Sequence, residues 1–159
     1  MSPVRETLMG RYNRLSKMSN ALYRHAARAC GMPETALWIL YSLREPEIRT
    51  QAELCSVMFQ SKQSVHSALQ KLVEEGYVTL TPAPENHRQK HISLTPSGDA
   101  LARSTADCIR RAETQALDSL TPAEADAFLN GYETLLTRLD VQLQNCLKPE
   151  ETPHEDPSV

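Results

Sequence analysis

The sequence has no hydrophobic stretch long enough to cross a bilayer, because its longest mainly apolar run covers only residues 36–43 and a membrane helix needs about 20. Its first ten residues, MSPVRETLMG, lack the apolar segment of a secretory signal. The four cysteines, Cys30, Cys55, Cys108 and Cys146, lie far apart and form no CxxC pair. We therefore expect no disulfide framework, and we expect all four cysteines to be buried, inert thiols. We expect a cytoplasmic protein with no membrane partner.

Signatures of catalysis are also lacking. The chain has no nucleophile elbow, no phosphate-binding loop and no group of Ser, His and Asp at catalytic spacing. His87 and His91 are of the right residue type for zinc, but no third ligand stands near them in the sequence. We therefore expect no enzyme, no metal and no cofactor, and we assign these histidines to phosphate contact.

Length and composition are ordinary for a folded chain: 159 residues, of which 40% are hydrophobic and 23% charged. The net charge of −3 is unevenly spread. Residues 1–31 carry six bases and one acid, a net +5, whereas residues 96–159 carry five bases and twelve acids, a net −7. These segments are either two solvated surfaces or partners that pack within or between chains. The bulk charge alone argues weakly against nucleic acid.

The stretch from Ser61 to Gly76 predicts the central helix. Its apolar residues recur at the spacing of an amphipathic helix, Ser61 is a good N-cap, and Gly76 suits the left-handed residue after a helix end. The outer face carries lysines and short neutral donors and acceptors in place of the Glu–Lys pairs typical of a solvated face. Such a face is suited to base edges in a major groove. The candidate DNA-binding residues on this helix are Ser61, Lys62, Gln63, Ser64, His66, Ser67 and Lys71.

Neighbouring segments turn this helix into part of a larger motif. Thr50-Gln51-Ala52-Glu53 is a capping box, so a short helix is expected from residue 51 to just before Ser61, which makes a helix-turn-helix. Residues 77–81 and 91–94 alternate as strands do. The proline-bounded loop between them holds the candidate wing residues Asn86, His87, Arg88 and Lys90. A basic, flexible loop of this kind is suited to the phosphate backbone or the minor groove.

The remaining segments predict helices at residues 5–30, 34–44, 96–120 and 122–147, followed by a disordered acidic tail at 148–159. The first and last of these helices carry apolar stripes that a single chain has too little core to cover, so we expect a homodimer. We expect Trp38 and Tyr41 to be mainly core residues. With His25 they are also candidates for the wall of a ligand pocket.

The order of elements resembles the MarR family of bacterial transcriptional regulators over residues 5–147. The residues that carry the resemblance are Leu72 to Val78 (LVEEGYV) and Leu94 to Gly98 (LTPSG). It implies a mainly α fold with a small β-hairpin wing (α+β), as one domain over residues 1–147. The winged helix-turn-helix lobe would span about 34–95, and the dimerisation helices about 5–30 and 96–147. It also implies a homodimer on a pseudo-palindromic DNA operator, with DNA affinity controlled by a small molecule or an oxidant.

The chain differs from the family pattern because it has fewer positively charged residues in the recognition helix and the wing. Ser67 replaces a frequent arginine, and Asn86-His87-Arg88 replaces Asp-Arg-Arg, which lowers the number of phosphate contacts. The expected function is sequence-specific binding of double-stranded DNA by a transcriptional regulator, with a repressor role expected and an activator role left open. The alternatives are a winged-helix module that binds a protein instead of an operator, and a thiol redox sensor of the same fold.

Overall fold

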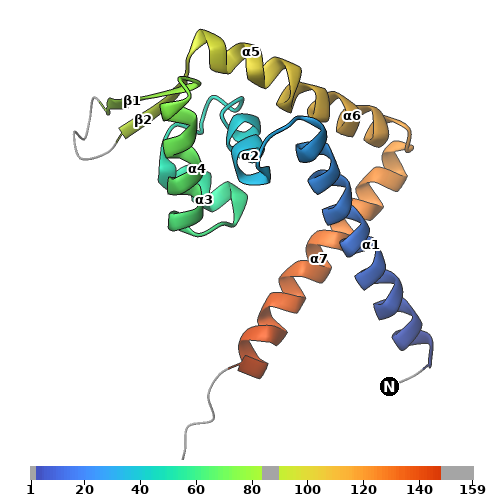
Figure 1. Ribbon diagram of the computed structural model, residues 1–159. Helices are drawn as coiled ribbons and strands as arrows, with labels where there is room; N and C mark the ends of the chain where they lie inside the picture. Colours follow the sequence, from blue (N-terminus) through green and yellow to red (C-terminus); the bar gives the residue numbers. More distant parts are fainter. Residues whose placement is uncertain (1–2, 84–89, 148–159) are drawn as a thin grey trace, which may run out of the picture. The chain divides into compact units, whose positions relative to one another are not determined.

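The computed structural model describes residues 3–83 and 90–147, with side chains described from residue 7 onward (Figure 1). Its contacts divide the chain into two compact units, Met1–Glu113 and Thr114–Val159. In chain order, the elements are α1 (Pro3–Ala29), α2 (Glu34–Ser42), α3 (Gln51–Met58), α4 (Lys62–Glu74), β1 (Val78–Pro82), β2 (Lys90–Leu94), α5 (Pro96–Ser104), α6 (Ala106–Asp118) and α7 (Pro122–Leu147). The predicted fold class is confirmed: the chain is mainly helical with one antiparallel hairpin.

The core of the first unit is built around α2. Its side chains are apolar on nearly every side, and Leu37, Ile39 and Leu40 are almost completely buried. Helices α3 and α4 pack against one another and against α2, as their grouping in Figure 1 shows. The same core takes Leu54 from α3, three apolar residues from α4, and residues from the hairpin and α5. Burial of each such side chain contributes about 1.5–3 kcal/mol before entropy is counted.

The predicted N-caps at Thr50 and Ser61 are confirmed, and hydrogen bonds explain both. Thr50 Oγ1 accepts from the Glu53 backbone N–H at 3.3 Å, while the Glu53 carboxylate accepts from the Thr50 N–H at 2.8 Å. Ser61 Oγ accepts from the Ser64 N–H at 3.1 Å. Each bond satisfies a donor that the first turn of a helix otherwise leaves without a partner.

The two predicted strands pair as an antiparallel hairpin in which apolar residues lie opposite one another. Val78 pairs with Leu94 and Leu80 with Ile92, which puts apolar residues on the face that packs against the core. The tip of the predicted wing, including Asn86, His87 and Arg88, and the predicted tail at 148–159 both lie outside the described residues.

The start of α5 is fastened to the start of β1 by Thr95 and Gly98. Thr95 Oγ1 accepts from the Gly98 N–H at 3.0 Å and donates to the Gly76 carbonyl at 2.7 Å. The Thr95 N–H donates to the Tyr77 carbonyl at 3.0 Å. A Cβ on Gly98 would lie 1.8 Å from the Tyr77 carbonyl oxygen, so only glycine fits there. The two sequence stretches that resemble the MarR family are thus in direct contact.

The single helix predicted over residues 96–120 is wrong, because the structure breaks it at Thr105. This residue has φ −118° and ψ −79°. Both its N–H and its hydroxyl donate to the Leu101 carbonyl, at 3.1 and 2.7 Å. A β-branched residue whose side chain bonds to the backbone competes with regular helix geometry. Helix α6 then begins at Ala106.

Arg44, just after α2, ties the core to the helices on both sides of this break. Its guanidinium donates to Asp99 on α5 at 2.5 Å and, through two nitrogens, to Asp107 on α6. Arg44 is four-fifths buried, whereas Arg103, the other partner of Asp99, is 72% exposed. The bonds to Arg44 hold the pKa of Asp99 below its ordinary value of 3.8.

The second unit is described from residue 114 to residue 147, and no residue of helix α7 is buried. Its apolar stripe instead lies exposed, and Phe128 stacks on Tyr132 with the ring centroids 5.9 Å apart. In the described part of the chain, no helix is long and apolar enough to cross a membrane.

We predict that Gly98→Ala destabilises the fold by about 3 kcal/mol or more, because its Cβ meets backbone that cannot move away. Urea unfolding followed by circular dichroism measures this. Gly10→Ala in α1 is the control: its Cβ meets nothing within 4 Å, so better helix propensity should stabilise the protein by up to about 1 kcal/mol. Equal stabilities for the two variants would contradict the account of this junction.

We predict that Arg44→Met lowers Tm by about 3–6 °C at pH 7, whereas Arg103→Met lowers it by less than about 2 °C, because the second arginine is exposed. Since the pKa of Asp99 is lowered in the folded state, its bond stabilises the protein above about pH 4 and is lost as the pH falls further. The difference in Tm between wild type and Arg44→Met should therefore shrink below pH 4. Calorimetry between pH 3 and 8 measures it, and a difference that grows toward acid would refute the assignment.

Candidate nucleic-acid interface

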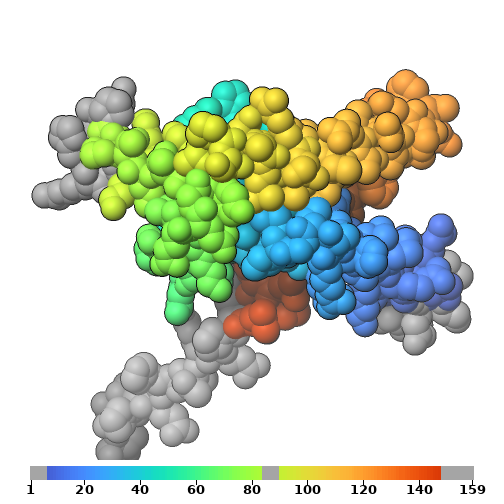
Figure 2. Space-filling model, turned by 45° about the horizontal axis from the view of Figure 1, so that its top comes forward, coloured from blue at the N-terminus to red at the C-terminus, as the bar shows by residue number. Residues whose placement is uncertain are grey.

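Helix α4 has one buried face and one open face. Val65, Leu69 and Leu72 are at most 2% exposed, and they hold the helix on the core. The green part of the molecule, which includes α4, lies at the surface in Figure 2. Each of the seven residues predicted from the sequence is exposed: Ser61, Lys62, Gln63, Ser64, His66, Ser67 and Lys71.

Ser61 caps the start of α4. Its hydroxyl accepts from the Ser64 N–H and lies 2.9 Å from the Ser64 hydroxyl. Of the predicted set, Lys62 and Gln63 follow directly in the first turn, with exposed side chains. The other exposed residues are divided between two grooves, one on each side of the helix.

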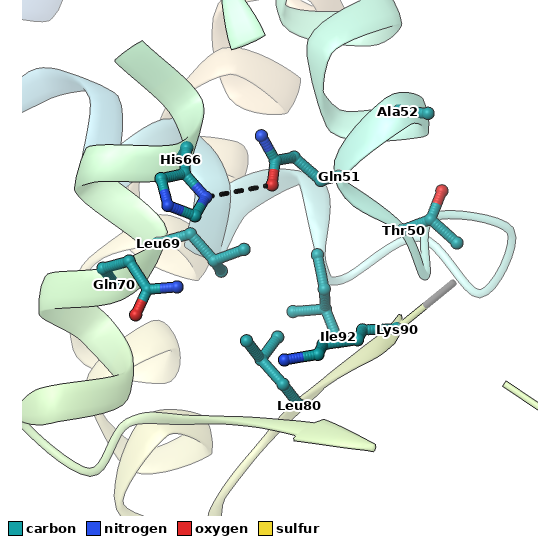
Figure 3. Close-up of a pocket in the computed structure, with 9 residues that line it drawn as sticks. All are labelled: Thr50, Gln51, Ala52, His66, Leu69, Gln70, Leu80, Lys90 and Ile92. Carbon is teal, nitrogen blue, oxygen red and sulfur yellow. Dashed lines mark hydrogen bonds between the residues drawn. The ribbon is translucent and has the colours of Figure 1, made fainter. Parts of the chain in front are cut away.

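The first groove, here called the wing-side groove, has a volume of about 350 Å³ and lies between α4, the start of α3 and the hairpin (Figure 3). His66 and Gln70 face it from α4, and Lys90 from β2. Its floor is apolar, formed by Leu69, Leu80 and Ile92, and its remaining wall comes from residues 50–52.

The second groove, here called the corner-side groove, has a volume of about 300 Å³ and lies between α4 and the turn from α1 to α2. Ser64, Ser67 and Lys71 line it from α4, and Glu75 stands at the same side. The opposite wall contains residues 31–33 and the first turn of α2, whose N-cap Pro33 supplies no side-chain cap. The backbone N–H groups of this turn are therefore suited to an anion.

The sequence analysis missed Gln51, which belongs to this surface. It is the first residue of α3, directly after the N-cap Thr50. Its Nε2 donates to the Lys62 carbonyl at 3.0 Å, and its Oε1 lies 3.4 Å from His66 Nδ1. Its position at the start of a helix was visible in the sequence, but its contact with α4 depends on how the two helices pack.

Of the four predicted wing residues, the structure describes Lys90 alone. Lys90 is exposed at the start of β2 and faces the wing-side groove. It therefore stands on the same surface as His66, although the two are far apart in the sequence. Asn86, His87 and Arg88 lie outside the described residues.

The predicted ligand-pocket residues are only partly brought together. Trp38 and Tyr41 line a cavity of about 410 Å³ with Ser42, Glu45, Ile48, Val57, Met58 and Gln60. Both rings are half-buried at this cavity, and Tyr41 also packs against the hydrophobic core, as the sequence predicts. His25 is exposed on α1 and does not line the cavity.

The cavity wall is fixed by an aromatic and carboxylate cluster that the sequence analysis did not identify. Trp38 packs edge to face between Tyr23 and Tyr41, with centroid distances of 5.0 and 5.2 Å. Both tyrosine hydroxyls donate to Glu113, at 2.7 and 2.6 Å. Burial and these bonds raise the pKa of both tyrosines to about 12. Arg110 lies over the Tyr41 ring and donates to Glu45 at 2.6 Å.

The expectation of buried cysteines is wrong. Cys30 and Cys55 are half-buried, and Cys108 and Cys146 are exposed on α6 and α7, all four as free thiols. In the part of the chain that the structure describes, no three His, Cys, Asp or Glu side chains gather as a metal site would require.

Comparison with known proteins agrees with this architecture. The model of the MarR family matches residues 31–89, which run from the turn before α2 into the wing. The HTH-type transcriptional repressor NicR of Pseudomonas putida is 28% identical over 118 residues, covering 70% of this chain and 75% of NicR.

Two solved structures share the fold. MepR of S. aureus, in complex with DNA, has a TM-score of 0.63 at 19% identity and covers 80% of this chain and 97% of its own. BpsR of Bordetella bronchiseptica has a TM-score of 0.62 at 16% identity, and the match covers 78% of this chain and 89% of BpsR. Its structure addresses the mechanism by which 6-hydroxynicotinic acid regulates its DNA binding. NicR is a transcriptional repressor, MepR is seen bound to DNA, and BpsR binds DNA under regulation. In its helix-turn-helix and β-hairpin wing, this chain is similar to the MarR family of transcriptional regulators, whose model matches residues 31–89.

Proposed function

We propose that this protein is a cytoplasmic repressor that binds a pseudo-palindromic DNA operator as a homodimer and is released by a small molecule. The observation that carries this proposal is the open face of α4, which presents uncharged donors and acceptors beside lysines while its other face is locked on the core. A B-DNA major groove is about 12 Å wide and admits one helix.

The cations on the two sides of α4 suit the two phosphate backbones that border a major groove. Lys90 stands at the wing-side groove, and Lys71 with the first turn of α2 at the corner-side groove. Contacts to phosphate position a protein without reading sequence, whereas side chains directed at base edges discriminate. We therefore assign Gln63, His66 and Ser67 to the bases. The wing residues Asn86, His87 and Arg88 join Lys90 in contacting the backbone.

A second copy of the chain is the partner that we assign to the exposed apolar side chains of α1 and α7. On α1, Leu8, Leu15 and Leu22 are 60, 45 and 63% exposed. On α7, Phe128, Leu136 and Leu143 are between 41 and 56% exposed. Exposure of such apolar stripes to water is unfavourable. A partner that covers them lowers the free energy by about 25 cal/mol for each Å² of apolar surface buried. In this proposal residues 1–147 act as one domain, with the lobe at 34–95.

The cavity at Trp38 and Tyr41 is the site that we assign to the effector. It is apolar, large enough for a single aromatic ring with substituents, and bordered by α2 and the end of α3. The curated relative NicR is a repressor, and the DNA binding of BpsR is regulated by 6-hydroxynicotinic acid. A ligand that prefers one arrangement of α2 and α3 would change the fraction of molecules able to bind DNA.

We predict that Gln63→Ala weakens binding to the cognate site by about 1–3 kcal/mol and hardly changes binding to random DNA, because a glutamine can make a bidentate contact with adenine. Lys90→Ala should weaken both by a similar factor and lower the slope of log K against log salt by about 0.9 per subunit. Salt titrations with cognate and scrambled duplexes measure both effects.

The control for the second variant is Lys17→Ala, which removes an exposed lysine from α1 and should leave the salt slope unchanged. If Lys90→Ala alters sequence preference while Gln63→Ala lowers the salt slope, the roles are assigned backwards. A protein that binds no duplex even at low salt would instead support the alternative of a protein-binding module.

We predict that an aromatic carboxylate or phenol that binds the cavity changes the fluorescence of Trp38, the only tryptophan of the sequence, and lowers DNA affinity about 5- to 150-fold. Val57→Phe places a ring at the cavity wall and should abolish both responses. Leu117→Phe, on an exposed position of α6, is the matched control and should keep them. If this class of compounds changes neither signal in the wild type, the ligand class is wrong.

A further inference from the structure

The contact between Gln51 and α4 determines the orientation of the Gln51 amide. The Lys62 carbonyl can only accept a hydrogen bond, so the amide atom 3.0 Å from it is the donor Nε2. The other amide atom is therefore the acceptor Oε1, and this atom lies 3.4 Å from His66 Nδ1 (Figure 3). A neutral imidazole can make a hydrogen bond to an acceptor only through its protonated ring nitrogen, so this contact favours a proton on Nδ1.

We propose that Gln51 sets the hydrogen-bonding sense of His66 and thereby the base that His66 reads. With Nδ1 protonated, the neutral ring carries a lone pair on Nε2, which becomes an acceptor. His66 is exposed and lines the wing-side groove beside the open face of α4, so this acceptor is available to a ligand. Gln51 acts here as a positioning residue that touches the histidine and has no assigned contact with DNA.

The chemistry of the major groove then selects the partner. An acceptor pairs with an exocyclic amino group, which adenine presents as N6–H₂ and cytosine as N4–H₂. The opposite tautomer, with Nε2 protonated, would pair with the acceptors of guanine and thymine. The inference rests on the proposed function, because it requires that α4 enters a major groove. The inference goes beyond the proposed function because it names the chemical group that His66 reads and identifies Gln51 as the residue that determines which group is read.

The first experiment measures the tautomer without DNA. Nitrogen-15 spectra of the histidine rings are recorded on the full chain at pH 8, where an unperturbed imidazole is neutral, with His66 assigned by comparison with His66→Ala. We expect the Nδ1–H form in the wild type and a shift toward the Nε2–H form in Gln51→Met, whose side chain is of similar size and lacks the amide acceptor.

Two further variants separate positioning from general disturbance. Gln51→Glu retains an acceptor beside Nδ1 and should keep Nδ1 protonated. Gln70→Met removes another glutamine from the same groove, one that has no hydrogen bond to His66 among the described contacts, and should leave the tautomer unchanged. A wild-type His66 in the Nε2–H form, or a tautomer that Gln51→Met does not change, overturns the proposal.

The second experiment measures what His66 reads. A preferred duplex is selected from a random pool with the wild type, and the base pair that His66 reads is the position at which His66→Ala loses its preference. There the amino group is removed by replacing adenine with purine, or cytosine with pyrimidin-2-one. We expect this to weaken wild-type binding about 3- to 10-fold, the worth of one hydrogen bond, and Gln51→Met binding less than about 2-fold.

An equal loss for both proteins overturns the assignment of the amino group. The two experiments test the two proposals independently. A protein that binds no DNA overturns the proposed function, whereas the ring spectra still decide whether Gln51 sets the tautomer of His66.

Discussion

The close contact between Gly98 and the Tyr77 carbonyl is the constraint on which the rest of the DNA-binding lobe depends. It brings the end of α4 and the start of α5 together, so both strands of the hairpin begin or end at the same place. Thr95 strengthens this junction because one hydroxyl caps α5 and bonds to Gly76 at once. The hairpin is therefore held beside α4, and the wing-side groove between them has a defined wall.

Much of this fold was predictable because the signals are local. Capping residues at 50, 61 and 95 mark helix starts, and alternation over a few residues predicts the two strands. The break at Thr105 was not predictable, because a threonine within an apolar repeat continues many helices. The side-chain bond to Leu101 that accompanies this break is visible only in the structure. Arg44 likewise looks like an ordinary surface residue until α5 and α6 place two carboxylates against it.

The candidate site was predictable to a lesser extent. The sequence indicates which residues of α4 are exposed, since helical periodicity separates inner from outer positions. It does not indicate that His66 and Ser67, adjacent in the chain, face different grooves, or that Gln51 contacts His66 from another helix. These facts depend on the packing of α2, α3 and the hairpin around α4. The expected pocket residue His25 shows the same limit, because sequence proximity to α2 does not place a side chain at its cavity.

Footprinting with hydroxyl radicals on a selected operator tests the central claim most directly, namely that two copies of the chain each place α4 in a major groove. The account predicts two related protected segments whose centres lie one helical turn apart, about 10 base pairs, or a multiple of this. Protection should disappear when the operator sequence is scrambled at moderate salt. A single protected segment without symmetry, or equal protection of scrambled DNA, would contradict the account.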